Sequence, residues 1–135
     1  MEVVLVTNGP GELYTWTQPV LRALREADKN LRVVISLVPD QFTSGNETAI
    51  AQSFGADAVT TPKEFLSYLT TGRKPEGLSG DKGVVIGLGG SVGMALQLAN
   101  RLSYPAYRYS FNPDWNRGLK KLFVHDERTF RNARL

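Results

Sequence analysis

Short, continuous apolar runs recur along the chain and constrain its fold more than any other feature. The runs are rich in Val and Ile and show little alternation of apolar and polar residues, which is typical of strands covered on both faces of a sheet. Helix signals lie between them, so we predict an α/β fold, a Rossmann-like parallel sheet with helices on both faces. The runs lie at residues 3–6, 33–38, 84–86 and 122–124, with weaker ones at 58–60 and 106–109.

The segments between the runs carry the start signals of helices. Residues 44–47 and 61–64 both have the spacing of a capping box, and Pro62 stands at the first helical position of the second. Residues 91–102 carry the clearest amphipathic stripe. Residues 70–83 are rich in glycine and polar residues, so we expect a long polar connection there.

Length and composition favour one soluble domain over residues 1–135. The absence of cysteine excludes disulfides and thiolate metal sites, and the single histidine, His125, excludes a histidine cluster. We therefore expect no metal. No apolar run is long enough to span a membrane and no leader pattern begins the chain, so we expect a cytoplasmic protein.

Positive charge is concentrated near the end of the chain. Residues 1–100 hold eight Lys or Arg against ten Asp or Glu, whereas residues 101–135 hold eight against three. Such a segment faces phosphates, an anionic lipid surface or an acidic partner, or it is simply a solvated helix face. The chain lacks a motif that combines aromatic and basic residues, so we expect no nucleic-acid partner. The cations are Arg101, Arg108, Arg117, Lys120, Lys121, Arg128, Arg131 and Arg134.

Residues 8–12 (Asn-Gly-Pro-Gly-Glu) follow the first apolar run and precede a helix start at 17–21. A strand, a glycine-rich turn and a helix place flexible backbone at the carboxyl edge of a parallel sheet, where ligands bind. Tyr14 occupies the place of the third glycine of a dinucleotide fingerprint, so the loop suits a sugar or another polyol better than a pyrophosphate. Glu12 either binds a sugar hydroxyl or acts as a base; alternatively, it pairs with a surface arginine or favours the helix start. The ligand-binding candidates here are Asn8, Gly9 and Gly11.

Two later loops should lie at the same edge of the sheet. Residues 87–91 lead into the amphipathic helix, and their N–H groups could hold an oxyanion or a hydroxyl, or form only a tight capped turn. Residues 110–118 follow another strand and contain a carboxylate and an aromatic ring. Trp16 and the tryptophan of the last loop could stack on a sugar or an acyl chain, although such rings more often pack in cores. The candidates are Gly89, Gly90, Ser91, Asn112, Asp114 and Trp115.

Three stretches of the chain resemble a known family. They are residues 8–12 with the helix through 19–24, residues 95–102, and residues 105–110 with the turn that holds Pro113 and Trp115. The chain resembles the N-terminal domain of lipid-A-disaccharide synthase and its homologues, which are GT-B glycosyltransferases. The resemblance implies that the fold is the N-terminal half of a GT-B enzyme.

The same resemblance implies an inverting transfer of a sugar from a UDP-sugar to an acceptor hydroxyl, with no metal or other cofactor. In this family the N-terminal half holds the acceptor and supplies the base, and a C-terminal half binds the nucleotide. Glu12 and Asp114 are then the catalytic candidates. We expect a chain that is inactive without the missing nucleotide-binding half. Its acceptor would be glycolipid-like or another hydroxyl compound, with peripheral contact at the inner face of the membrane.

One departure from the family keeps other functions open. Residues 88–93 contain no carboxylate where the synthase carries an acidic segment, which leaves its expected base missing and argues against lipid A as the acceptor. The alternative is a stand-alone Rossmann-like module that binds a small anionic or nucleotide ligand through residues 8–12 and 87–91. A third interpretation is an interaction domain that docks through its basic C-terminal helix.

Overall fold

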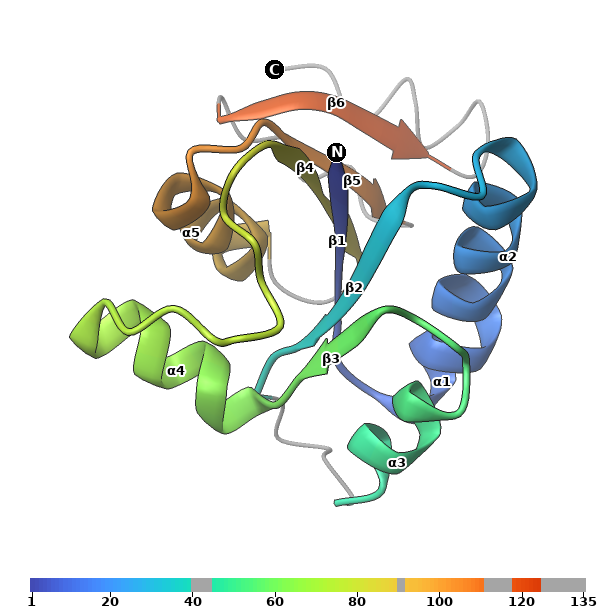
Figure 1. Ribbon diagram of the computed structural model, residues 1–135, viewed down its shortest axis with the longest axis horizontal. Coiled ribbons are helices and arrows are strands. Elements are labelled where there is room, and N and C mark those ends of the chain that lie inside the picture. The colour runs from blue at the N-terminus through green and yellow to red at the C-terminus, as the bar shows by residue number, and fades with distance from the viewer. Residues whose placement is uncertain (40–44, 90–91, 111–117, 125–135) are drawn as a thin grey trace.

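A computed structural model describes residues 1–39, 45–89, 92–110 and 118–124. These residues form a six-stranded parallel sheet with helices on both faces, as predicted (Figure 1). In chain order the elements are β1 (Glu2–Thr7), α1 (Pro10–Glu12), the π-helix η1 (Leu13–Thr17), α2 (Gln18–Ala27), β2 (Arg32–Leu37), α3 (Glu47–Gln52), β3 (Ala58–Thr60), α4 (Pro62–Thr71), β4 (Gly83–Leu88), α5 (Val92–Leu102), β5 (Ala106–Ser110) and β6 (Leu119–Val124).

The strand order determines where a ligand site can form. The order is β3-β2-β1-β4-β5-β6, and all neighbouring strands are parallel. Strands β2 and β3 are therefore added in turn on one side of β1. The chain then crosses to the other side of β1, where β4, β5 and β6 are added in turn. In open α/β sheets, ligands bind beyond the carboxyl ends of the strands where this direction reverses. That point lies between β1 and β4.

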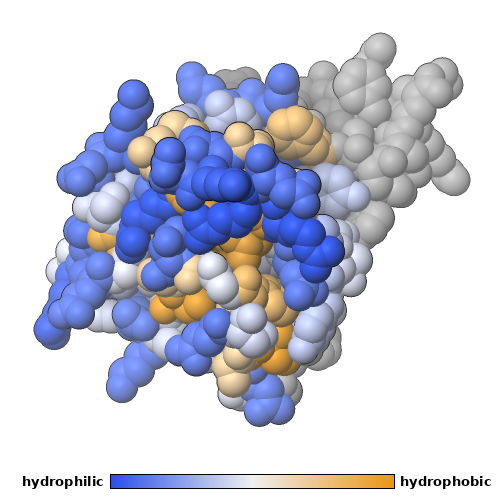
Figure 2. Space-filling view, turned by 45° about the vertical axis from the view of Figure 1, so that its right-hand side comes forward, coloured by the Kyte–Doolittle hydropathy of each residue, from blue (hydrophilic) through white to orange (hydrophobic). Residues whose placement is uncertain are grey.

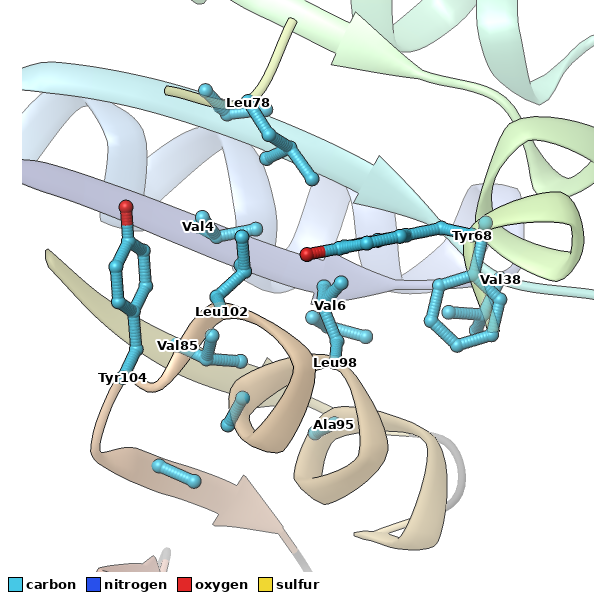
Figure 3. Close-up of a cluster of buried hydrophobic side chains, with 14 of the residues drawn as sticks. Val4, Val6, Val38, Tyr68, Leu78, Val85, Ala95, Leu98, Leu102 and Tyr104 are labelled. Atoms are coloured by element: carbon cyan, nitrogen blue, oxygen red, sulfur yellow. The ribbon is translucent and has the colours of Figure 1, made fainter. Parts of the chain in front are cut away.

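The sheet is buried between two layers of helices. Helices α4 and α5 cover one face, and α1, η1, α2 and α3 lie on the other (Figure 1). Every residue of β1 is buried, and alternate side chains enter opposite cores because successive residues of a strand face opposite ways. Val4 and Val6 pack towards α4 and α5, among the side chains of Figure 3, whereas Val3 and Leu5 pack towards α2.

The capping box predicted at the start of α4 is confirmed. The Thr61 hydroxyl accepts a hydrogen bond from the Glu64 N–H at 3.2 Å, and the Glu64 carboxylate accepts one from the Thr61 N–H at 3.1 Å. Pro62 occupies the first turn, and Gly72 ends the helix with a φ of 77°. Local sequence therefore defines both ends of this helix.

The capping box predicted at residues 44–47 differs from the observed start of α3. Ser44 lies outside the described residues, and Asn46 stands at the N-cap without a side-chain capping bond. The buried Glu47 carboxylate instead accepts a hydrogen bond from the Gly45 N–H at 3.0 Å. The glutamate thus stabilises the turn before the helix. Its donor is the N–H group two residues earlier in the chain, whereas a capping box uses the N–H group three residues earlier.

The polar connection between α4 and β4 is anchored at the amino edge of the sheet. Leu78 is only 1 % exposed and packs with the core of Figure 3. The Ser79 N–H donates a hydrogen bond at 3.0 Å to Glu2, and the Arg32 guanidinium donates to the Gly77 carbonyl. One buried leucine and these two hydrogen bonds therefore hold the connection in place. Its composition predicted only that the segment would be polar.

Helix α2 presents a mixed surface to the solvent. Leu21 is buried against the sheet, while Arg22, Ala23 and Glu26 are exposed. Figure 2, which brings the right-hand side of Figure 1 forward, shows hydrophilic residues over most of this face with apolar surface between them. In the part of the chain that the structure describes, no helix has the length and apolar character to cross a membrane.

Candidate functional site

The turn after β1 is shorter than the sequence indicates. The Asn8 carboxamide oxygen accepts a hydrogen bond from the Gly9 N–H at 2.9 Å, and the chain is helical from Pro10 onward. The helix start predicted at 17–21 agrees with α2, which begins at Gln18, but α1 and η1 precede it directly, so helical backbone already starts at Pro10. Gly11 lies within α1 and not in a loop, and a Cβ atom there would meet nothing within 4 Å. Its backbone freedom is thus not required.

A π-helical turn joins α1 to α2. The Gln18 N–H donates to the carbonyl of Leu13, five residues earlier, which defines the wider turn. Leu13 and Thr17 are buried against the sheet, whereas Tyr14 is 55 % exposed. Such turns are rare and occur often at functional sites. Here the turn lies directly beyond Glu12, at the carboxyl edge of the sheet.

The loop after β4 approaches this helical segment closely at Gly89. Its φ is +79°, and a Cβ atom there would lie 2.5 Å from Trp16 Cζ3 and 3.1 Å from Glu12 Cγ. The Gly89 N–H donates to the Tyr109 carbonyl at 3.3 Å. Only a glycine fits such a position. The structure thus brings together Glu12 and Gly89, two site candidates that are 77 positions apart in the sequence.

Glu12 stands at the side of a small hollow. The hollow measures about 370 Å³ and is lined by Gly11, Glu12, Thr15 and Trp16. Glu12 is half-buried, and the described part of the structure gives its carboxylate no hydrogen bond and no ion pair. The alternative in which Glu12 pairs with a surface arginine is therefore not seen among those residues. Among the residues that the structure describes, none occupies its oxygens.

Trp16 separates this hollow from a larger apolar groove. Its ring meets Tyr109 edge to face, with centroids 5.3 Å apart and an interplanar angle of 79°. One side of the residue lines the Glu12 hollow, and the other lines a groove of about 500 Å³. Trp16 is thus part of the packing between η1 and the sheet, as the more ordinary interpretation of a tryptophan predicts.

Half of the predicted site lies outside the described residues. Among the candidates that the structure does describe, Glu12 and Gly89 lie together, and Asn8 and Gly9 form the turn at the end of the neighbouring strand β1. The remaining candidates fall beyond the described ranges and stay predictions. They are Gly90, Ser91, Asn112, Asp114 and Trp115.

Two residues of β5 near this edge were missed by the sequence analysis. Tyr109 packs against Trp16 and lines the groove. Arg108 was assigned to a basic surface, but it is only 3 % exposed and its side chain passes beside Gly87, on the face that α5 covers. The signal for both was the alternation of the strand, which directs Ala106 and Arg108 to one face and Tyr107 and Tyr109 to the other.

The described residues contain no group of three or more His, Cys, Asp or Glu side chains that could hold a metal ion. Comparison of the chain with protein-family models finds no match, and comparison with curated proteins finds none either. Function is therefore inferred from the chain's own residues and their geometry.

Proposed function

We propose that this chain is the acceptor-binding half of an inverting, UDP-sugar-dependent glycosyltransferase resembling lipid-A-disaccharide synthase. The observation that carries the proposal is the position of Glu12. This half-buried carboxylate lies against Gly89, at the point where the strand order reverses between β1 and β4. Ligands bind at such points in open α/β sheets. The hollow beside Glu12, about 370 Å³, falls within the usual range of ligand pockets, roughly 300–1,000 Å³.

The proposed chemistry assigns Glu12 the role of general base. The acceptor oxygen attacks the anomeric carbon of the donor sugar, and its proton passes to the Glu12 carboxylate. The bond between that carbon and the diphosphate oxygen breaks, so UDP leaves with the bonding electron pair. A base must reach the hydroxyl that it deprotonates. A carboxylate without an ion-pair partner among the described residues has its lone pairs available for that contact.

The acceptor that we propose is glycolipid-like or another hydroxyl compound, met in the cytoplasm at the inner face of the membrane. Lys120 and Lys121 of β6 are exposed and support a peripheral contact with anionic headgroups. The nucleotide-binding half would supply the N–H dipoles or cations that stabilise the leaving diphosphate. The chain alone should therefore transfer no sugar.

Replacement of Glu12 by Gln in the complete two-half enzyme tests the catalytic role. We expect kcat to fall by about 10²–10⁴-fold, the usual contribution of a general base, while the acceptor KM changes little. Glu26→Gln is the matched control, because Glu26 is an exposed carboxylate on α2. Steady-state rates at saturating UDP-sugar provide the measurement. Wild-type kcat in Glu12→Gln would remove this residue as the base, and Asp114→Gln should then be measured in the same way.

A second candidate function is a stand-alone module that binds a small anionic or nucleotide ligand. The six-strand order favours it, because this order is the one found in dinucleotide-binding Rossmann folds. Amide chemical shifts of the isolated chain distinguish the two functions. An alkyl glycoside should shift the signals of Gly9, Glu12 and Gly89, and UDP should not. Saturable shifts of the same amides with UDP alone would favour the nucleotide module.

A further inference from the structure

A second hollow lies between α4 and the connection that follows it. After α4 ends, the chain returns alongside the helix (Figure 1). The hollow measures about 340 Å³. Lys63 and Ser67, four residues apart on one face of α4, line one side of it, and Arg73, Pro75 and Glu76 of the connection line the other. It is therefore separate from the proposed acceptor site, which lies beside α1 and η1.

Hydrogen bonds hold the connection side of the hollow in place. Pro75 is buried, and its carbonyl accepts a hydrogen bond from the Leu78 N–H at 3.1 Å. The Lys74 ammonium group donates to the carbonyl of Leu78 and, at 3.1 Å, to that of Ser79. The Ser79 N–H donates in turn to the buried Glu2 carboxylate. The backbone that carries the lining side chains is thus fixed before any ligand arrives, which lowers the cost of binding.

The charged side chains at the hollow fall into two groups. The Glu64 carboxylate belongs to the capping box of α4, and Lys74 holds the connection. The side chains of Lys63, Arg73 and Glu76, by contrast, form no hydrogen bond or ion pair within the described ranges. Helix stability does not account for Lys63 either, because a cation in the first turn faces the positive end of the helix dipole.

We propose that this hollow binds a phosphorylated polyol, such as a sugar phosphate. Lysine and arginine form strong, charge-assisted hydrogen bonds with phosphate oxygens, so Lys63 and Arg73 hold the phosphate group.

The polyol part of the ligand accounts for the remaining groups. The Glu76 carboxylate repels a bare phosphate ion, but it can accept hydrogen bonds from the hydroxyls of a polyol. The half-buried Ser67 hydroxyl can donate to the same hydroxyls or accept from them. The volume also suits such a ligand, because pockets for small molecules measure roughly 300–1,000 Å³.

Amide chemical shifts of the chain, titrated with glucose 6-phosphate, test the site directly. We expect saturable shifts at Lys63, Ser67, Arg73 and Glu76, and weaker binding of inorganic phosphate. The absence of saturable shifts at these residues would overturn the proposal. Binding to vesicles that contain phosphatidic acid, without any response to glucose 6-phosphate, would also overturn it, because a lipid headgroup would then be the ligand. Neither measurement requires sugar transfer.

Three variants separate the phosphate contact from the polyol contact. Arg73→Gln should weaken the binding of glucose 6-phosphate about tenfold, as expected for the loss of a hydrogen bond to a charged group. Arg22→Gln is the matched control, because Arg22 is exposed on α2 at the opposite face of the sheet. Glu76→Ala should weaken glucose 6-phosphate but strengthen inorganic phosphate, because it removes both an acceptor for hydroxyls and a repelling charge. Equal effects of the two arginine variants, or stronger binding of both ligands to Glu76→Ala, would contradict the proposal.

Discussion

Gly89 is the residue at which the loop after β4 meets the helical segment after β1. An L-residue at its φ of +79° carries strain of about 1–2 kcal/mol. A Cβ atom would in addition lie 2.5 Å from the Trp16 ring, and tight packing of this kind costs about 1–3 kcal/mol. We therefore predict that Gly89→Ala lowers the free energy of unfolding by about 2–5 kcal/mol, the sum of these two costs, measured by denaturant titration.

Gly55 provides the matched control for this substitution. Its φ is +80°, but a Cβ atom there would meet nothing within 4 Å. Gly55→Ala therefore introduces the same backbone strain without the steric contact, and it should cost only about 1–2 kcal/mol. If the two alanine variants lose the same free energy, Trp16 does not approach Gly89 as closely as described.

At the scale of elements, α4 offers a prediction that depends on local sequence alone. Thr61→Ala removes the hydroxyl that accepts the Glu64 N–H, so one N–H group at the start of the helix loses its partner. We expect the free energy of unfolding to fall by about 1 kcal/mol. Chemical denaturation measures this change without any assumption about function.

The same substitution near the other end of α4 serves as its control. The exposed Thr70 hydroxyl donates to the Leu66 carbonyl at 2.9 Å, a bond within the helix that does little for its stability. Thr70→Ala should therefore be neutral or slightly stabilising, because alanine is the better helix former. A loss at Thr70 as large as that at Thr61 would mean that general helix packing, and not the cap, is being measured.

The strands were predictable because parallel strands buried on both faces need continuous apolar runs. The runs at 3–6 and 33–38 became β1 and β2, and the edge strand β3 was visible as the weak run at 58–60. The π-turn was not predictable, because its apolar spacing does not differ enough from that of an α-helix. The extra residue in η1 reflects how Leu13 and Thr17 pack on the sheet, which is a tertiary effect.

The candidate site was predictable in its place and less so in its detail. Parallel topology alone puts the ends of β1 and β4 at one edge, so the proximity of residues 8–12 to Gly89 follows from fold class. The contact of Trp16 with Gly89 depends on the π-turn, and the burial of Arg108 depends on α5. Such contacts join segments that are distant in the sequence, so the residue pattern within a single segment does not predict them.

At the scale of the whole molecule, Glu2 connects distant parts of the chain at the amino edge of the sheet. Its buried carboxylate accepts hydrogen bonds from Arg32 Nε at 3.0 Å, the Ser79 N–H at 3.0 Å and the Tyr104 hydroxyl at 2.9 Å. These partners lie 30, 77 and 102 positions away. One side chain thus holds β1, β2, the connection before β4 and the segment between α5 and β5 together.

The environment of Glu2 fixes its protonation state in the folded protein. Burial by itself raises the pKa of this carboxyl, but the hydrogen bonds from Ser79, Tyr104 and Arg32 and the charge of Arg32 outweigh it, so the pKa lies below the ordinary value of 4.5. Burial and the neighbouring carboxylate raise the pKa of Tyr104, which therefore remains a donor at neutral pH. The pKa of Asp57 is lowered as well, but this carboxylate is more exposed and solvent weakens its contribution.

These shifts predict how global stability responds to acid. Because the pKa of Glu2 is lower in the folded protein than in the unfolded chain, its contribution is complete above pH 4.5 and is lost as the pH falls through the folded pKa. At pH 7, Glu2→Gln should lower the free energy of unfolding by about 2 kcal/mol, because the amide cannot replace a carboxylate that accepts three hydrogen bonds. As the pH falls below 4.5 the gap between wild type and variant should narrow, and it closes only below the folded pKa of Glu2, where both side chains are neutral.

Denaturant titrations of both proteins from pH 7 to pH 3 measure this gap, with Glu26→Gln as the exposed control that should show little difference at any pH. The shape of the curve separates two physical origins of the stabilisation. A gap that closes in acid assigns it to the ionised carboxylate and its donors. A gap that stays constant to pH 3 would assign it to the shape of the side chain, and the lowered pKa of Glu2 would then be wrong. Because the four segments meet at Glu2, the loss should appear as one cooperative transition and not as local unfolding of the connection before β4.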